Sequence, residues 1–314
     1  MAGNAGNAGN AGNAGNAGGV GALNAGTFGT PIIPDRVDLP FVTVLQSPGG
    51  GQDSIRPLAQ RPRSEPIAQC TLALTSFPER SWSAEWRAWF ALSQYGATDW
   101  AKDIKVQPWK PGKTGDEIDQ LIVAARDERP DTLGEILAQN EEFASYFMVL
   151  LTITPASCPK TFRLICLASI VAMFTVLHFK GGTKGKEGLD EKDQYEPRPR
   201  PSQICPALLP SVPVPGHASY PSGHSTEAHL IAAVIEQVLT HKKNGKTVAN
   251  AEWQNAITPL YALAARIGRN REIAGLHYPS DTEAGKKLAQ DILPFLKETA
   301  EYKELISLAA EEWQ

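Results

Sequence analysis

The chain lacks the paired cysteines that a zinc site or a disulfide framework requires. Its 314 residues contain four cysteines, Cys70, Cys158, Cys166 and Cys205, and no CxxC pair. Zinc sites and disulfide-rich domains show closely spaced cysteines in recognisable patterns. We therefore expect reduced, mostly buried thiols and no metal site built from cysteine.

An excess of positive charge is also missing. The chain has 30 Lys and Arg residues against 34 Asp and Glu residues, which gives a formal net charge of −4 at pH 7. Proteins that bind nucleic acid neutralise its phosphates with clustered Lys and Arg, and no such cluster stands out here. Nucleic acid is therefore not an expected partner.

Targeting and membrane-spanning patterns are absent as well. The chain starts without the basic segment and apolar run of a signal peptide. Its most apolar stretch, Leu164 to Leu177, is shorter than the about 20 residues that a transmembrane helix needs. These patterns predict a soluble protein without a membrane span, placed in the cytoplasm because no signal peptide is seen.

Two segments of biased composition precede the periodic part of the chain. Residues 1–19 repeat Ala, Gly and Asn and carry no charged side chain, which predicts a disordered tail that we extend to residue 30. Residues 31–80 are rich in Pro, Gly and Ser and predict an extended segment that wraps the surface. The third predicted segment, residues 81–314, is the helical catalytic domain.

Helical periodicity dominates that domain, and no run of alternating apolar and polar residues predicts a sheet of any size. The predicted fold is therefore an all-α helical bundle. Trp82, Trp86 and Trp89 at the first helix are interpreted as core residues. The expected helices are Ser83 to Tyr95, a helix around Ile118 to Ala125 that stops at Pro130, Leu133 to Leu151 with Thr132 as its N-cap, Leu164 to Phe179, Ser225 to Leu239, Trp253 to Ile273 and Asp281 to Leu296.

The segment Pro221, Ser222, Gly223, His224 predicts an anion site at a helix start. Pro and Gly fit a tight turn into the helix that follows. A helix N-terminus offers unpaired N–H groups and the positive end of the helix dipole to an oxyanion. Ser222 adds a hydroxyl donor, and Gly223 lets the backbone approach closely.

A second segment, Gly268 to Asp281, combines an arginine with a histidine and a carboxylate. His277 follows Arg271 across Gly275 and precedes Asp281 by four residues. At that spacing a carboxylate accepts the proton of one ring nitrogen and directs the other. This arrangement improves an imidazole as a nucleophile or as a metal ligand.

A third segment, EPRPRPSQICP at residues 196–206, holds two arginines in a stretch that its prolines stiffen. The planar guanidinium groups of Arg198 and Arg200 suit bidentate binding of a tetrahedral oxyanion. The three segments together predict a site for such an anion.

In their order along the chain, the three segments resemble the signature of the superfamily of type 2 phosphatidic acid phosphatases and vanadium-dependent haloperoxidases. That signature has a lysine and an Arg-Pro pair, then PSGH, then an Arg, His and Asp cluster. PSGH is complete here, the spacing of Arg271, His277 and Asp281 matches, and Asn270 replaces the usual Ser. The resemblance covers Asp116 to Leu296 and implies a helical bundle of the acid phosphatase and vanadium haloperoxidase type.

The position of the signature lysine differs from the family pattern. The family lysine precedes the motif arginine by seven residues, but Asp193 stands seven residues before Arg200. We prefer Lys180, at the end of the apolar helix, which implies an insertion loop at 181–193. That segment is polar and glycine-rich, as a surface insertion should be. Lys192, one residue out of register, is the alternative.

The resemblance also implies roles for individual residues. In the phosphatase branch His277 attacks phosphorus, Asp281 orients it, and His224 protonates the leaving alcohol, without a metal. Water then hydrolyses the phosphohistidine. The implied phosphate cage consists of Lys180, Arg200, Ser222, Gly223 and Arg271. The residues expected to contact these cage residues without binding the phosphate are His217, Lys192 and Arg198.

Two alternatives to a phosphatase stay open. In a vanadium haloperoxidase the same cage holds vanadate as a cofactor, with His277 as its ligand. The segment HYPSD is similar to soluble acid phosphatases, whereas PGHASYPSGH with His217 is similar to bromoperoxidases. We favour the phosphatase, acting on a small phosphate ester whose leaving group the sequence does not define. The second alternative is a phosphate-binding protein without turnover, and the resemblance further implies a homodimer.

Overall fold

A computed structural model describes residues 82–185 and 190–314. The predicted tail at 1–30 and the predicted wrapping segment at 31–80 lie outside the described residues, as does Cys70. Within them, 69% of the residues are helical and 2% are in strands, and about nine helices of more than four residues pack as a bundle. The predicted all-α bundle is confirmed at this level.

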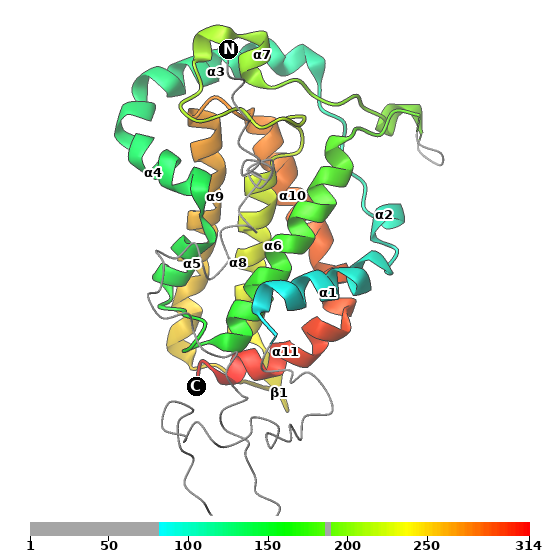
Figure 1. The fold of residues 1–314 in the computed structure, drawn as a ribbon, viewed down its shortest axis with the longest axis vertical. Coiled ribbons are helices and arrows are strands. Elements are labelled where there is room, and N and C mark those ends of the chain that lie inside the picture. The colour runs from blue at the N-terminus through cyan, green and yellow to red at the C-terminus, as the bar shows by residue number, and fades with distance from the viewer. Residues whose placement is uncertain (1–81, 186–189) are drawn as a thin grey trace, which may run out of the picture.

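Most of the helices are joined by short turns and 3-10 segments, whereas long loops precede α7 and α8 (Figure 1). They are α1 (Ala84–Gly96), α2 (Trp100–Asp103), α3 (Thr114–Asp127), α4 (Arg129–Glu141), α5 (Ala144–Leu150), α6 (Pro159–Lys180), α7 (Pro201–Ile204), α8 (Gly223–Thr240), α9 (Ile257–Ile273), α10 (Pro279–Glu298) and α11 (Ala300–Glu311). The 3-10 helices are η7 (Pro111–Lys113), η8 (Glu191–Asp193), η9 (Pro206–Leu208) and η10 (Ala251–Ala256). Two short antiparallel strands, β1 (Lys242–Lys243) and β2 (Lys246–Thr247), form a hairpin after α8.

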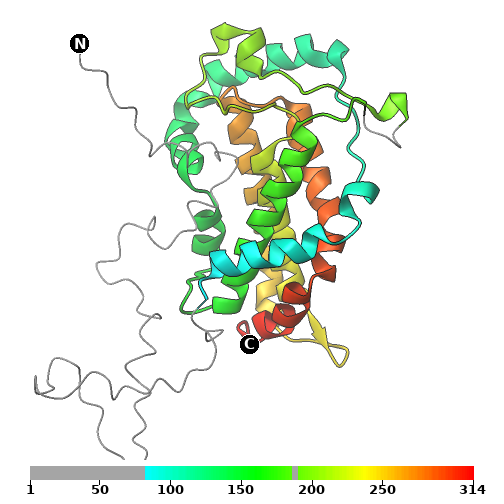
Figure 2. The ribbon, with the colours of Figure 1, turned by 45° about the vertical axis from the view of Figure 1, so that its right-hand side comes forward.

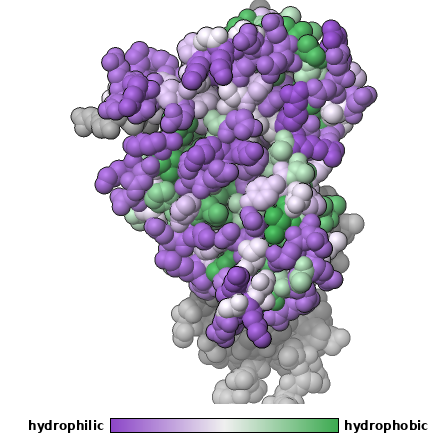
Figure 3. Space-filling model, turned by 180° about the vertical axis from the view of Figure 1, so that it is seen from behind, coloured by the Kyte–Doolittle hydropathy of each residue, from purple (hydrophilic) through white to green (hydrophobic). Residues whose placement is uncertain are grey.

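Helix α8 forms the centre of the bundle, with α6, α9 and α10 packed around it (Figure 1). Helices α6 and α8 carry apolar residues on every side, which is typical of helices buried all round. Helix α1 crosses the outer side of α6, and α3, α4 and α5 cover α9 (Figure 2). The face opposite that of Figure 1 is mostly hydrophilic (Figure 3), as expected when apolar residues point inward.

Helix α6 is longer than the sequence pattern predicts because it begins at Pro159, which is tolerated in a first helical turn. Among the described residues it is the one helix long and apolar enough to cross a membrane, with 72% of its most apolar window buried inside the bundle. A core helix passes the same test, so this helix is weak evidence for a membrane span.

The predicted helix from Leu133 to Leu151 is wrong and consists of two helices, α4 and α5. Helix α3 ends at Asp127, shortly before Pro130, as predicted, and Pro130 itself lies in the first turn of α4. Thr132 is not an N-cap, because its hydroxyl donates to the Glu128 carbonyl at 2.9 Å. The break comes at Glu142, whose two carboxylate oxygens accept the Ser145 N–H at 3.0 and 2.9 Å. Only Glu142 and Phe143 separate the two helices, and this contact ties Glu142 to the first turn of α5.

The tryptophans of the first helix are not core residues, contrary to the prediction. Their exposed fractions are 41% for Trp82, 67% for Trp86 and 47% for Trp89. Helix α1 instead packs on α6 through Ala88, Ala91 and Tyr95. Small alanine side chains let two helices approach closely, and the bulky aromatics are left on the outer side.

Two glycines let the helices of the bundle meet at one end. A Cβ atom at Gly285 of α10 would lie 2.5 Å from the Ser222 carbonyl oxygen, and one at Gly268 of α9 would lie 2.7 Å from Thr282 Cγ2. Real Cβ atoms do not come so close to other atoms, so any side chain here would push the helices apart. The glycines therefore bring the starts of α8 and α10 together.

Glu227 is an acidic side chain inside the core, on α8. It is 1% exposed, and its Oε2 atom has no hydrogen-bond partner within residues 82–185 and 190–314. Burial raises the pKa of Glu227 well above its usual range, the hydroxyl of Ser169 opposes this shift, and the carboxylate of Glu142 adds to it. The protonated form is therefore the one that the fold favours.

Glu227→Gln should raise the free energy of unfolding at neutral pH by about 1–3 kcal/mol, because the wild-type carboxylate must take up a proton before it is buried, whereas the amide is neutral already. The pKa is higher in the folded state, so the stabilising contribution of protonated Glu227 is complete below an unfolded pKa of about 4.3 and is lost as pH rises through the folded value. Urea unfolding should therefore show a gap between variant and wild type that widens with pH. Glu304→Gln, at an exposed site on α11, should show none.

Candidate active site

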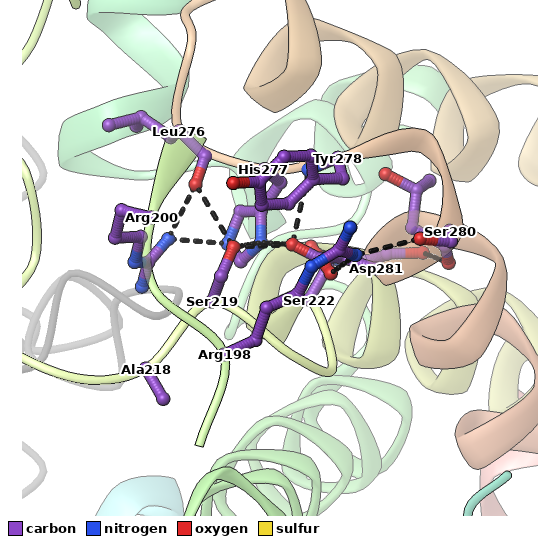
Figure 4. A network of polar contacts seen from close by, with 12 residues as sticks. Arg198, Arg200, Ala218, Ser219, Ser222, Leu276, His277, Tyr278, Ser280 and Asp281 are labelled. Carbon is purple, nitrogen blue, oxygen red and sulfur yellow. Dashed lines mark hydrogen bonds and ion pairs between the residues drawn. The ribbon is translucent and has the colours of Figure 1, made fainter. Parts of the chain in front are cut away.

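The segments singled out in the sequence meet where α6 ends and where α8 and α10 begin (Figures 1 and 4). The Ser222 N–H donates to the Asp281 carbonyl at 2.9 Å, which ties the start of α8 to the start of α10. Arg200 approaches from the N-cap of α7. Residues from four distant parts of the chain thus share one buried site.

His277 lies in the turn between α9 and α10, with both ring nitrogens engaged. Its Nδ1 is 3.1 Å from Asp281 Oδ2, and its Nε2 is 2.9 Å from Arg200 Nη1 (Figure 4). A guanidinium group can only donate, so Nε2 is the acceptor and the ring proton sits on Nδ1, facing Asp281. Burial and the cations of Arg200 and Lys180 hold the pKa of His277 well below its usual range, which keeps the imidazole neutral.

Arg200 is held by backbone carbonyls and is 2% exposed. Its Nε donates to the His217 carbonyl at 3.0 Å, and its Nη1 donates to the Leu276 carbonyl at 2.9 Å. Burial lowers the pKa of Arg200 to about 10, although the Asp281 carboxylate opposes this shift. The side chain is therefore a fixed, charged donor beside His277.

Lys180, the last residue of α6, is the lysine that reaches the site. It is 3% exposed, and its Nζ donates to the carbonyls of Ala218 and Ser219 at 2.9 and 2.8 Å. Burial and the charge of Arg200 lower its pKa well below the usual range. Lys192, the alternative, is exposed on η8 and pairs with Asp190 at 3.3 Å. It lies outside the site and does not support the cage.

The two ends of the predicted insertion lie side by side. The Thr183 N–H donates to the Tyr195 carbonyl at 2.9 Å, and Gly182 has a positive φ of 77°. A Cβ atom at Gly182 would lie 2.8 Å from Pro197 Cδ, so glycine is needed where the two ends of the loop approach each other. The chain after Tyr195 therefore returns to the end of α6, which brings Arg200 close enough for its charge to act on Lys180.

Arg271 and His224 form the other side of the site, and each is 1% exposed. The two Nη atoms of Arg271 lie 3.3 Å from Asn140 Oδ1. The His224 ring packs against Phe143 with 5.0 Å between centroids and an angle of 34° between the ring planes. Burial and the charge of Arg200 lower the pKa of Arg271 to about 9. Burial and Arg271 also hold the pKa of His224 well below its usual range. Arg271 Nε and His224 Nε2 have no hydrogen-bond partner in the described part of the chain.

Ser222 and Gly223 start α8 as predicted. Ser222 is the N-cap, and its hydroxyl accepts the Ser225 N–H at 3.4 Å. Both residues are buried. The first N–H groups of a helix have no partner within it, so the Gly223 amide is a further donor on this side of the site.

His217 and Arg198 support the site without sharing its centre. His217 Nδ1 lies 3.0 Å from Arg200 Nη2, and burial, with the charges of Lys180 and Arg200, lowers the His217 pKa to about 4. Arg198 is 1% exposed and donates to Asp281 Oδ1 at 2.7 Å. It therefore faces the carboxylate behind His277.

An excess of buried positive charge is the main electrostatic feature of the site. Lys180, Arg200 and Arg271 have no carboxylate within 4.0 Å among the described residues. The nearest acid of the site, Asp281, is already paired with Arg198. Buried charges normally have a partner, so this arrangement suits an anion that carries more than one negative charge.

Sequence reasoning missed several residues that complete the site. Ser219 donates its hydroxyl to Asp281 Oδ2 in a short contact, and its own segment, PGHASYPSGH, offered a signal for it (Figure 4). Glu117, Asn140 and Phe143 gave no such signal, because a polar or aromatic residue on an amphipathic helix has the same pattern whether or not it touches a site.

Comparison with protein-family models and with curated proteins finds no match for this chain. The likeness to the phosphatase and haloperoxidase superfamily therefore depends on the motifs and their order.

Proposed function

We propose that this chain is a phosphomonoester hydrolase that works through a phosphohistidine, as a member of the superfamily that its motifs resemble. One observation carries the proposal: three buried cations without carboxylate partners surround a neutral histidine whose proton faces Asp281. A phosphate monoester dianion supplies the missing negative charge. His277 Nε2 then provides the lone pair that attacks phosphorus.

The first chemical step transfers the phosphoryl group to His277. Arg200 must release His277 Nε2 before this nitrogen can attack, and the freed N–H can then donate to a phosphoryl oxygen. The bond between Nε2 and phosphorus forms while the bond from phosphorus to the ester oxygen breaks. The cations stabilise the charge that spreads over the phosphoryl oxygens, and Asp281 stabilises the positive charge that develops on the ring.

His224 supplies the proton that the leaving alcohol needs. Its low pKa in the anion-free site comes from burial first and then from Arg271. A bound dianion offsets that positive field and raises the pKa, so substrate binding and protonation are coupled. In the second step water gives its proton to His224 and its oxygen to phosphorus, which releases inorganic phosphate and restores His277.

The same donors fit vanadate, which is a tetrahedral oxyanion like phosphate. Lys180, Arg200 and Arg271 would hold its oxygens, and His277 Nε2 would be its ligand. Bound there, vanadate supplies activation of peroxide toward halide, the chemistry of the haloperoxidase alternative. A binding protein without turnover fits less well, because it does not require the oriented pair of His277 and Asp281.

The test compares three readouts on purified, metal-stripped protein: phosphate release from an aryl phosphate, halide oxidation with peroxide and orthovanadate, and binding of inorganic phosphate. We expect phosphate release without metal, inhibited by orthovanadate. Lys180→Met should abolish it, and Lys192→Met, the matched control, should not, because Lys192 is exposed and outside the site.

Halide oxidation seen only with vanadate would replace the proposal by a haloperoxidase. Tight binding of inorganic phosphate without either reaction would replace it by a phosphate-binding protein.

A further inference from the structure

Arg198 connects the carboxylate behind His277 to a second carboxylate. Its Nη1 donates to Asp281 Oδ1 and to Ser280 Oγ, both at 2.7 Å, and its Nη2 donates to Glu117 Oε2 at 2.7 Å. The guanidinium carbon lies 3.6 Å from the ring centre of Tyr278. A planar fork that is stacked on a ring and bonded at both ends has little freedom to move.

Glu117 comes from α3 and also holds the start of α10. It is 7% exposed, and its Oε1 accepts the Ser280 N–H at 2.8 Å, a contact across 163 residues of sequence. The first N–H groups of a helix need such acceptors. A single carboxylate thus fixes both Arg198 and the first turn of α10, which carries Asp281.

These contacts leave Asp281 no freedom to rotate. Its Oδ1 accepts from Arg198, and its Oδ2 accepts from the Ser219 hydroxyl, from the Tyr278 N–H at 3.1 Å and from His277 Nδ1 at 3.1 Å. The direction of the His277 ring is set by this carboxylate. Anything that fixes Asp281 therefore fixes the nitrogen that faces the anion site.

We infer that Glu117 and Arg198 are positioning residues for His277, an inference that rests on the proposed phosphatase function. Glu117 also contributes a negative charge to the group that it forms with Arg198 and Asp281. Arg198 alone would neutralise Asp281, whereas Arg198 shared between Asp281 and Glu117 leaves one net negative charge on the group. That charge favours the positive charge which His277 acquires when its nitrogen bonds to phosphorus.

The test uses Glu117→Gln, which keeps the shape of the side chain and removes its charge. Gln has one oxygen for the two donors, Arg198 and Ser280, so one contact weakens. We expect kcat for an aryl phosphate to fall by about 10- to 100-fold, the usual range for residues that orient a reacting group from behind. The dissociation constant of inorganic phosphate should change less, because the cations of the cage are untouched.

A second readout follows His277 directly and does not need turnover. In protein labelled with ¹⁵N-histidine, the Nδ1–H signal of His277, identified by its loss in His277→Gln, should show a strong hydrogen bond in the wild type and a weaker one in Glu117→Gln. Arg198→Lys, which keeps the charge but cannot bridge both carboxylates, should produce the larger change. This variant also serves if Glu117→Gln does not fold.

Glu128→Gln is the matched control, since Glu128 ends the same helix and pairs with Arg269 away from the site. It should leave kcat and the His277 signal unchanged. A wild-type kcat and an unaltered His277 signal in Glu117→Gln and Arg198→Lys would overturn the inference and leave the phosphatase intact. If wild-type protein releases no phosphate, the proposed function fails, and the His277 signal still decides whether Glu117 and Arg198 position the ring.

Discussion

Replacing His277 by Gln is expected to lower phosphate release from an aryl phosphate by about four orders of magnitude or more, the loss typical of a missing nucleophile. The structure gives the reason. Nε2 is the one unprotonated nitrogen of a ring whose other nitrogen faces Asp281, and it lies beside Arg200. No other side chain of the site offers a lone pair oriented by a carboxylate in this way among the described residues.

His229→Gln is the control for this substitution. His229 is also a buried histidine, 5% exposed on α8, and its Nδ1 lies 2.8 Å from the Ser225 carbonyl, as expected of a histidine that satisfies a helix backbone. Its replacement removes the same kind of ring from the same bundle without touching the anion site. Equal losses in the two variants would mean that the effect is on folding, which would contradict the nucleophile assignment.

Rapid acid or base quenching of a labelled substrate separates the roles of the two site histidines. Wild-type protein should hold label that survives base and is lost in acid, as expected of a phosphoramidate, and His277→Gln should hold none. His224→Gln should still form the labelled species from an ester with a good leaving group, because such a group needs no proton from His224. Label on His277→Gln would contradict the proposed intermediate.

The sequence predicts the inner helices of the fold well and the outer ones less well. The predicted range Ser225 to Leu239 nearly equals α8, because a helix apolar on all sides has no competing interpretation. The predictions at Thr132 and Trp86 are wrong for a shared reason. Where a helix breaks, or which side of it faces the bundle, depends on contacts such as Glu142 with Ser145 that only the folded chain creates.

The site follows a similar division. The residues of the three motifs could be predicted because each motif has a local pattern. These patterns are a turn into a helix, a histidine four residues before a carboxylate, and arginines in a proline-rich segment. Glu117 could not be predicted, since it reaches Arg198 from a helix that the motifs do not include. The polar, glycine-rich segment 181–193 favours Lys180 over Lys192 from sequence alone, but the contact of Thr183 with Tyr195 that returns the chain to the end of α6 could not be predicted.

The second prediction with a large expected effect concerns Arg271→Met. This substitution should stabilise the anion-free protein and should remove the stabilisation that phosphate gives. Arg271→Met should raise the free energy of unfolding of the anion-free protein by about 1–4 kcal/mol, the range seen when buried charges are replaced by apolar residues of similar size. Burial and the neighbouring charge of Arg200 both disfavour the charged form of Arg271 and lower its pKa to about 9. Its bonds to Asn140, both 3.3 Å long, are too weak to offset that cost.

The same substitution should remove the stabilisation that phosphate gives. At a phosphate concentration of about 100 times the dissociation constant, wild-type protein gains about 2.7 kcal/mol by mass action. The bound dianion offsets part of the positive charge of Lys180, Arg200 and Arg271. Thermal unfolding with and without inorganic phosphate should show a wide gap for wild type and almost none for Arg271→Met.

Arg266→Met tests whether any arginine of α9 would behave this way. Arg266 lies on the same helix, its side chain is 64% exposed, and it pairs with Glu135 at the surface. Its loss should change neither the stability without phosphate nor the response to phosphate. If Arg271→Met unfolds more easily than wild type without anion, the buried cations are not in excess and the case for an anion site weakens. If it is more stable but no longer responds to phosphate, the protein gives up stability in the anion-free state to bind the phosphoryl group tightly.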